Sequence, residues 1–413
     1  MSDDLHNPSG DFAVATSSIT SETAVSRPLK IMLVAGEASG DQLGGRLMAA
    51  LKRQHADIKF IGVGGPRMIG EGMQSLFSMN EMSVMGLAEI IPHIPRLLRR
   101  IRETANLALA ERPDVVVTID APDFSFRVGK KLATAGIPLV HYVAPSVWAW
   151  RPGRARKIAK FLDHLLALLP FEPPYFEREG LATTFIGHSA VEERHGGDAG
   201  RFRAQHGLTA DQKVIAILPG SRHSEVSRLL PVFRDVVVRL ANDDPDACFV
   251  MPTVSKVEDT VRQVTSEWPV KTVVVATDQE RRDAFSCAHA ALAASGTVSL
   301  ELGIVGVPHV IGYRVSATSA WLARKLLKVD TVTIINLVLG RKLVPEYLQE
   351  DCTADKLYHA MKKLNDLGER RDEQLAGFDE ATTLLGFGQT PPSDKAASVV
   401  LEIAQQGKQQ RPK

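Results

Sequence analysis

The fold is decided by a stretch near the amino terminus, which reads Ile31-Met-Leu-Val-Ala-Gly-Glu-Ala-Ser-Gly-Asp-Gln-Leu-Gly-Gly45. An apolar run passes through a glycine turn into a segment with helical spacing, which predicts a strand, a tight turn and a helix. The same order of features occurs in Val214-Ile-Ala-Ile-Leu-Pro-Gly-Ser-Arg-His-Ser-Glu225. This doubled start predicts two domains of similar architecture.

Short apolar runs alternate with helical stretches over most of the chain. Most runs are rich in Val, Ile and Leu, as expected for strands buried on both faces of a parallel sheet. The alternation predicts the α/β class, with doubly wound sheets. The predicted strands are Ile31–Ala35, Phe60–Val63, Val115–Ile119, Val140–Val143, Leu165–Leu168 and Thr184–Ile186, then Val214–Leu218, Phe249–Met251, Thr272–Val275, Ala291–Ala294 and His309–Ile311, with later helices near Ala354–Leu367 and Lys395–Gln405.

The length of 413 residues fits two domains of ordinary size. Residues 1–28 are polar, lack a hydrophobic run and do not have the layout of a secretory signal, so we expect a disordered extension. The polar run Glu192–Gly200 is the predicted linker between Rossmann-like domains at 29–192 and 200–368, with helices and a tail at 369–413. Two such domains place the carboxyl ends of both sheets around one cleft, which suits an enzyme with two substrates.

The composition restricts the classes of function. Hydrophobic residues make up 44% of the chain and charged residues 23%, as in globular proteins. A formal net charge of +1 gives no global attraction to nucleic acid, so we expect no nucleic-acid partner. No window reaches the apolar length of a membrane-spanning helix. The 3 scattered cysteines lack metal-ligand spacing and suit a reducing cytoplasm.

The first glycine turn places Gly36, Glu37, Ser39 and Asp41 between a strand and a helix. Backbone N–H groups at such a turn can hold an anionic or polar ligand. The glycine spacing does not match the dinucleotide fingerprint, and the lysine of a phosphate-binding loop is absent. A tight turn in which Asp41 acts as a cap explains the pattern equally well.

Asp120 follows directly after the predicted strand Val115–Ile119, at the sheet edge where ligands bind. Pro122 stiffens the exit from the strand, and a partly desolvated carboxylate there could act as a general base on a hydroxyl group. The alternative is that Asp120 or Asp123 caps the next helix. The pattern favours catalysis for Asp120 and capping for Asp123.

The second glycine turn indicates a phosphate site. Gly220 and Ser221 stand where a helix begins, and Arg222 is placed to reach a phosphate oxygen. The stretch Ser295–Thr297 repeats the arrangement, and Glu301 lies about one turn further on, where its carboxylate could bind ribose hydroxyls. Each feature alone could be helix capping, but together they favour binding of a nucleoside diphosphate.

Two segments could meet lipid or sugar. Met85–Ile101 carries an apolar stripe broken by prolines and bordered by arginines up to Arg102, which fits either a membrane-surface segment or a buried helix. Trp148 and Trp150 stand beside a basic run. Tryptophans near cations occur on sugar faces and at membrane interfaces, but the local pattern favours an ordinary core.

No metal-binding constellation is found in the sequence, and no cofactor is expected. The histidines and cysteines are dispersed. A positive helix end together with Arg222 could neutralise a leaving diphosphate without a cation.

The motifs, taken in order, resemble the lipid-A-disaccharide synthase family over roughly 30–405. One departure from the family pattern is Ser125, where an Asn is expected after Phe124. The segments that carry the resemblance are Val34–Asp41, Ile119–Phe124, His141–Trp150, Leu218–Arg222 and Ser295–Thr297, with Ile335–Leu337 and Leu348–Glu350.

The resemblance implies a GT-B fold, in which two Rossmann-like domains face a cleft and a C-terminal helix crosses back to the first domain. It implies an inverting transfer from UDP-2,3-diacylglucosamine to 2,3-diacylglucosamine 1-phosphate (lipid X), which gives a β-1,6 disaccharide and UDP. Asp120 would be the base, because inversion needs only one displacement. The other implied contacts are Glu37, Ser39, Asp41, Trp148 and Trp150 for the substrates, and Gly220, Ser221, Arg222, Ser295, Gly296, Thr297, Glu301 and Asn336 for UDP.

Lipid substrates imply that Met85–Arg102 meets acyl chains or the inner-membrane surface. The protein would then be peripheral on the cytoplasmic face, as a monomer or a homodimer. Rival interpretations are a UDP-GlcNAc 2-epimerase, the glycosyltransferase of peptidoglycan lipid II, or a binding protein without catalysis. The tryptophans and the apolar segment favour acylated substrates over the substrate of an epimerase.

Overall fold

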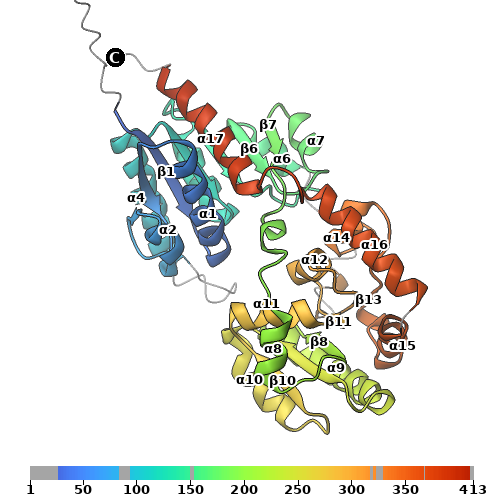
Figure 1. Cartoon of the computed structure of the whole chain (residues 1–413). Helices are drawn as coiled ribbons and strands as arrows, with labels where there is room; N and C mark the ends of the chain where they lie inside the picture. Colours follow the sequence, from blue (N-terminus) through green and yellow to red (C-terminus); the bar gives the residue numbers. More distant parts are fainter. Residues whose placement is uncertain are drawn as a thin grey trace, which may run out of the picture.

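The computed structural model describes residues 27–82, 94–148, 153–316, 320–321, 329–366 and 368–409. The predicted polar extension lies outside the described residues except for 27–28, as do Trp150 and residues 85–93 of the apolar segment. The described chain forms two parallel sheets flanked by helices (Figure 1). The predicted α/β class and the two-sheet architecture are confirmed.

The first sheet has the strand order β3-β2-β1-β4-β5-β6-β7, and every pairing is parallel. The direction of winding reverses between β1 and β4, whose last residues, Ala35 and Ile119, lie opposite each other. Ligands bind at such switch points in open α/β sheets. The strands are β1 Leu29–Ala35, β2 Ile58–Val63, β3 Gln74–Ser75, β4 Val115–Ile119, β5 Leu139–Tyr142, β6 His164–Ala167 and β7 Ala182–Phe185.

Both faces of the first sheet are covered because successive strand residues point to opposite sides. Ile31 and Leu33 of β1 join one core cluster, and Met32 and Val34 join the other. The first cluster is closed by α1 (Ala38–Gln54), α2 (Pro66–Gly70) and α17 (Pro392–Gln409). The second is closed by α4 (Ile94–Glu111), α5 (Pro122–Leu132), α6 (Gly153–Ile158) and α7 (Pro173–Glu177).

The second sheet has the order β10-β9-β8-β11-β12-β13 and is also parallel, so its switch point lies between β8 and β11. Its strands are β8 Val214–Leu218, β9 Cys248–Pro252, β10 Thr272–Val275, β11 Ala290–Ala293, β12 His309–Tyr313 and β13 Glu346–Leu348. One face packs on α8 (Ala199–His206), α11 (Asp278–Cys287), α12 (Thr297–Ile304), α14 (Ile334–Leu339) and α16 (Glu369–Leu384). The other packs on α9 (His223–Asp243), α10 (Ser255–Ser266) and α15 (Ala354–Asn365).

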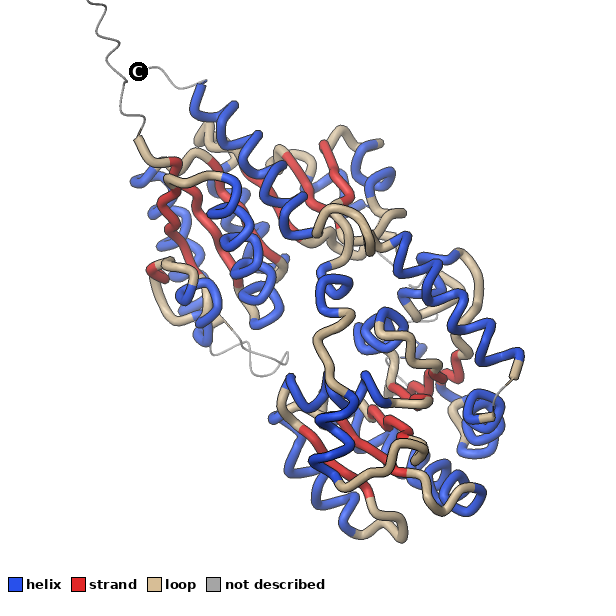
Figure 2. Tube along the Cα trace, viewed as in Figure 1, coloured by secondary structure: helices blue, strands red, loops and turns tan. Residues whose placement is uncertain are grey.

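Two connections join the sheets. The first passes through a short 3-10 helix, η3 (Ser189–Glu193), where Arg46 of α1 forms an ion pair with Glu193 and donates to the Ser189 carbonyl at 3.0 Å. The second runs from α16 to α17, which returns to the first sheet and packs along α1 (Figures 1 and 2). The predicted C-terminal helix that crosses back to the first domain is confirmed.

All predicted strands are present, and the structure adds β3 and β13. The predicted helices near 354–367 and 395–405 correspond to α15 and α17, and α16 lies between them. The buried face of α16 includes Gln374, Gly377 and Thr382, so it lacks the apolar stripe from which a helix is recognised. Gln374 accepts from the His309 N–H at 2.9 Å and donates to the His309 carbonyl at 3.1 Å.

We expect docking of α17 to stabilise the first domain. Val400 is fully buried in the cluster between α17 and the sheet, so Val400→Asp would bury an unpaired carboxylate. It should destabilise the fold by at least about 3 kcal/mol, measured as a lower urea midpoint by circular dichroism. Gln405→Asp changes an exposed residue of the same helix and is the matched control. Equal midpoints for the two variants would contradict the stabilising role of α17.

Candidate active site

The residues at the switch point of the first sheet bring two carboxylates together. Glu37 follows β1 and Asp120 follows β4, and the β1–β4 pairing places both at the carboxyl edge of the sheet. The Ser39 hydroxyl donates to Asp120 Oδ2 at 3.1 Å. Three predicted site residues, Glu37, Ser39 and Asp120, are therefore adjacent.

The backbone at Asp120 is fixed on both sides. Its N–H donates to the Tyr142 carbonyl of β5 at 2.9 Å, and its carbonyl accepts from the Ser125 hydroxyl at 2.7 Å. Ser125 is buried, so the residue that departs from the family pattern has a positioning role that the sequence did not reveal.

Asp120 and Ala121 both adopt left-handed backbone conformations, with φ of 51° and 41°. This conformation costs an L-residue about 1–2 kcal/mol, and such strain is concentrated at functional sites. Gly36 lies against this turn, since a Cβ atom there would stand 2.6 Å from the Ala121 Cβ. Glycine at position 36 thus allows β1 to approach the strained turn.

The environment alters the proton affinity of Glu37. Partial burial is the larger cause that raises the pKa of Glu37, and the negative charge of Asp120 raises this pKa further. A carboxyl group that holds its proton to higher pH can donate a hydrogen bond to a ligand oxygen. The pair therefore offers one carboxyl with raised proton affinity beside a second that accepts from Ser39.

Asp41 has a different role from its neighbours. It is only 4% exposed, and its Oδ1 accepts from the backbone N–H groups of Gly65 at 2.8 Å and Met68 at 3.1 Å. Its Oδ2 accepts from Arg67 N–H at 3.0 Å. The carboxylate thus caps the start of α2, a helix distant in sequence. Asp41 is therefore a cap, but of α2 and not of its own turn, and its contact with a sugar stays a prediction.

Trp148 packs inside the molecule. Its ring meets the Phe171 ring edge-on at 5.4 Å, and its indole N–H donates to Glu172 Oε1 at 3.3 Å. Burial raises the pKa of Glu172 to about 7. Trp148 joins the partly buried residues around one core cluster of the second sheet, which agrees with the core interpretation. Its predicted partner, Trp150, lies outside the described residues.

In the second domain, Leu218 of β8 lies opposite Ala293 of β11, so Gly220 and Ser295 follow at the same sheet edge. Gly220 has φ of 109°, and a Cβ there would lie 2.5 Å from Glu225 Oε2. The turn therefore requires glycine for its conformation and for space. The next helix, α9, begins directly after Arg222, whose side chain is 66% exposed.

Glu225 organises this turn. Its Oε2 accepts from the N–H groups of Ser221 at 3.0 Å and Arg222 at 3.3 Å, and its Oε1 accepts from the Arg222 guanidinium at 2.8 Å. The Tyr313 hydroxyl donates to the same Oε1 at 3.1 Å. Burial and this carboxylate raise the pKa of Tyr313 to about 12. A glutamate three residues after a helix cap is a known signal for this arrangement, so the capping role of Glu225 was recognisable in the sequence.

Ser295, Gly296 and Thr297 form a more open helix start. Gly296 has φ of 158°, a Cβ there would meet no atom within 4 Å, and no side chain caps α12 within the described residues. Glu301 of α12 pairs with Arg281 at 3.0 Å, and burial raises its pKa. Both side chains line a cavity of about 260 Å³ whose other wall includes Glu193 and Arg194.

Asn336 is buried and holds a loop. Its Oδ1 accepts from the N–H groups of Leu343 and Val344, each at 2.9 Å. Its Nδ2 donates to the Val344 carbonyl at 3.0 Å and to Thr331 Oγ1 at 3.2 Å. With the amide engaged in this way, Asn336 fits a positioning role better than direct contact with UDP.

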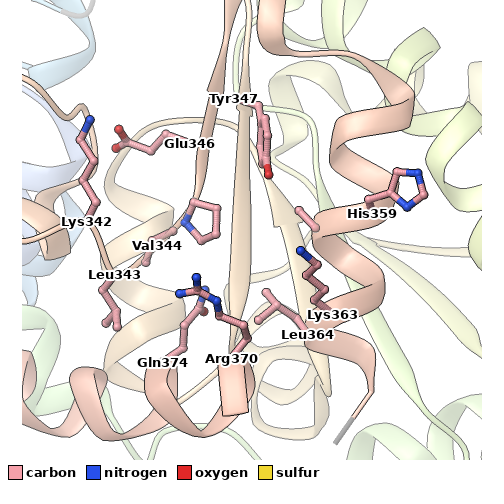
Figure 3. Close-up of a pocket in the computed structure, with 12 residues that line it drawn as sticks. Lys342, Leu343, Val344, Glu346, Tyr347, His359, Lys363, Leu364, Arg370 and Gln374 are labelled. Carbon is pink, nitrogen blue, oxygen red and sulfur yellow. The ribbon is translucent and has the colours of Figure 1, made fainter. Parts of the chain in front are cut away.

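A further cavity, of about 360 Å³, is distinct from both strand-end sites. It lies beside the start of β13, and Figure 3 shows Lys363 and Leu364 on one wall and Arg370 and Gln374 on another. The strands are parallel, so the start of β13 lies at the sheet edge opposite Gly220 and Ser295. This cavity is therefore separate from the glycine turns at Gly220 and Gly296.

Other features bear on metals and membranes. Among the residues that the structure describes, no group of three or more His, Cys, Asp or Glu could hold a metal ion. The helices in the described ranges are too short or too polar to cross a membrane. The described part of Met85–Arg102 begins α4, which buries Ile101 but leaves Ile94 at 40% and Leu98 at 43% exposure.

Solved structures with related architecture share the fold at low identity. A UDP-GlcNAc 2-epimerase from Neisseria meningitidis bound to UDP-GlcNAc has a TM-score of 0.61 and 13% identity, and the match covers 91% of this chain and 100% of the other. The glycotransferase of kitacinnamycin has a TM-score of 0.62 and 16% identity, over 92% and 100%. These likenesses confirm the GT-B type of fold.

Relatives in sequence are much more similar. The family model described as Lipid-A-disaccharide synthetase matches residues 31–400. The lipid-A-disaccharide synthase of Rhodospirillum centenum is 52% identical over 91% of this chain and 95% of its own length. That of Paramagnetospirillum magneticum is 46% identical over 92% and 99%. Together with the fold and the paired strand-end sites, these matches show that the chain belongs to the lipid-A-disaccharide synthase family of glycosyltransferases.

Proposed function

We propose that the protein transfers 2,3-diacylglucosamine from UDP to the 6-hydroxyl of 2,3-diacylglucosamine 1-phosphate. The products would be the β-1,6 lipid A disaccharide 1-phosphate and UDP. The observation that carries this proposal is the placement of Asp120 beside Ser39 and Glu37 at one switch point, with the Gly220 and Gly296 turns at the other.

Asp120 acts as the general base in this proposal. As the acceptor hydroxyl oxygen bonds to the anomeric carbon of the donor, Asp120 takes the hydroxyl proton and the bond to the UDP oxygen breaks. This single displacement inverts an α-linked donor to a β-linked product. The hydrogen bonds that fix the Asp120 backbone and Oδ2 keep the carboxylate in one orientation, which favours its reaction with a positioned hydroxyl.

The second domain holds the UDP leaving group. Charge that develops on the diphosphate is stabilised by the starts of α9 and α12 and by Arg222. Glu301 binds the ribose hydroxyls from the buried wall of its cavity. Glu225 and Asn336 act through the loops that they hold.

Both substrates carry acyl chains, and we propose that the protein meets them at the cytoplasmic face of the inner membrane. The exposed Ile94 and Leu98 of α4 lie among arginines, of which Arg100 is paired with Glu81 at 2.7 Å. Apolar side chains next to cations suit the surface of an anionic membrane.

Replacing Asp120 tests the base. Asp120→Asn should lower the rate of disaccharide formation roughly 100- to 10,000-fold with little change in the KM for the UDP donor. The readout is disaccharide and UDP released from purified protein. Asp235→Asn, an exposed position on α9, should retain the wild-type rate. An Asp120→Asn rate equal to that of the control would refute the base assignment.

Replacing Arg222 tests the nucleotide site. Arg222→Gln removes the exposed guanidinium at the Gly220 turn and should weaken UDP binding at least about tenfold by isothermal titration calorimetry. Arg234→Gln makes the same charge change at an exposed position of α9 and should bind UDP as the wild type does. If both variants bind UDP equally, Arg222 does not contact the diphosphate.

A further inference from the structure

A cavity of about 490 Å³ opens between α5 and α6 in the first domain. We call it the α5–α6 cavity. None of the residues assigned above to the donor nucleotide lines it. Its walls are Pro122, Asp123, Phe126, Arg127 and Lys130 from α5, and Gly153, Arg154, Lys157, Ile158 and Phe161 from α6 and the turn that follows.

The α5–α6 cavity has an excess of positive charge. Four cations, Arg127, Lys130, Arg154 and Lys157, face a single carboxylate, that of Asp123. Among the residues that the structure describes, Arg127, Lys130 and Lys157 have no ion-pair partner within 4.0 Å. These three unpaired side chains outnumber the one carboxylate of the lining, and such an excess creates a local positive potential that attracts anions.

The floor of the α5–α6 cavity is aromatic and closely packed. The Phe126 and Phe161 rings meet edge-on at 5.9 Å, and the Arg154 guanidinium lies 5.2 Å from the centre of the Phe126 ring. A Cβ on Gly129 would lie 3.0 Å from the Phe161 ring, so the backbone of α5 packs closely against this ring. The contact with the Phe126 ring limits the motion of the Arg154 side chain and so fixes the directions in which its guanidinium N–H groups can donate.

The position of the α5–α6 cavity connects it with the proposed base. The cavity reaches Pro122, the first residue of α5, which follows the strained turn at Asp120 and Ala121. The helices α4, α5 and α6 all cover the same face of the first sheet. An anionic lipid at the surface formed by α4 therefore has a cationic recess on the same face, next to the catalytic edge of the sheet.

We propose that the α5–α6 cavity binds the phosphate of the acceptor sugar while Asp120 engages its hydroxyl group. This inference rests on the proposed function, in which the reaction involves two phosphate-bearing substrates. The donor diphosphate is assigned to the second domain. The phosphate monoester of the acceptor therefore still needs a binding site, and we assign it to the first domain. A phosphate monoester dianion forms charge-assisted hydrogen bonds with Arg and Lys side chains. Holding the acceptor sugar both by its phosphate and by its hydroxyl group orients the sugar for reaction.

The test removes one lysine from each wall of the cavity. Lys130→Gln combined with Lys157→Gln changes two exposed side chains that have no ion pair to lose within the described residues. The control, Lys131→Gln with Lys160→Gln, removes the same charge from exposed positions near the cavity but not in its lining. Initial rates are measured in neutral detergent micelles with the phosphorylated acceptor and with an acceptor whose phosphate has been removed.

The cavity variant should raise the KM for the phosphorylated acceptor at least about tenfold over the control, with the KM for the donor unchanged. With the dephosphorylated acceptor, the wild type, the cavity variant and the control should have equal KM values. Equal KM values for the two variants with the phosphorylated acceptor would overturn the inference and leave the proposed function intact.

Two other outcomes would also overturn the inference. A defect that appears only on vesicles containing phosphatidylglycerol, and not in micelles, would assign the cavity to lipid headgroups of the membrane. Absence of disaccharide with the wild type would refute the proposed function itself, and the acceptor site with it.

Discussion

The parallel pairing of β1 with β4 is the contact on which the proposed catalytic edge depends. It sets the end of β1 beside the end of β4, so that Glu37 and Asp120 meet although they are far apart in sequence. Gly36 permits the approach because any larger residue would collide with Ala121. The left-handed turn at Asp120 is retained because the hydrogen bonds to Tyr142 and Ser125 hold it on both sides. Local strain is offset by these fixed contacts, and the carboxylate is oriented before any ligand arrives.

The second sheet repeats this constraint with different side chains. The pairing of β8 with β11 places Gly220 and Ser295 at one edge, as β1 and β4 place Glu37 and Asp120 in the first domain. The first edge carries carboxylates, which suit sugar hydroxyls, and the second carries Arg222 at a helix start, which suits phosphate. One architecture thus provides two sites whose chemistry differs through a few residues. The α16–α17 connection joins the two domains, and the ion pair between Arg46 and Glu193 holds the other connection, η3, against the first domain.

Much of this could be predicted from the sequence, and the failures have physical reasons. Buried parallel strands are apolar throughout, so runs such as Val115–Ile119 were recognisable, whereas β3 and β13 are too short to form such runs. Residues that follow strand ends were placed correctly because topology fixes that edge. Asp41 and Asn336 were harder, because their partners are backbone N–H groups that no sequence motif marks. Those of Asp41 lie in a distant segment at Gly65–Met68, and those of Asn336 lie in the loop after its own helix, at Leu343–Val344. A polar residue that serves the fold and one that serves a ligand look alike until those partners are located.

In the proposed reaction, a base on the first domain and a nucleotide site on the second cooperate in one inverting displacement. Nuclear magnetic resonance of a reaction mixture of purified protein, UDP-2,3-diacylglucosamine and 2,3-diacylglucosamine 1-phosphate tests it most directly, since it follows the anomeric signals of donor and product together. We expect loss of the α-linked donor with equimolar appearance of UDP and of a β-linked disaccharide joined through the acceptor 6-position. An α-linked disaccharide, or conversion of the donor to an epimer without any disaccharide, would contradict it.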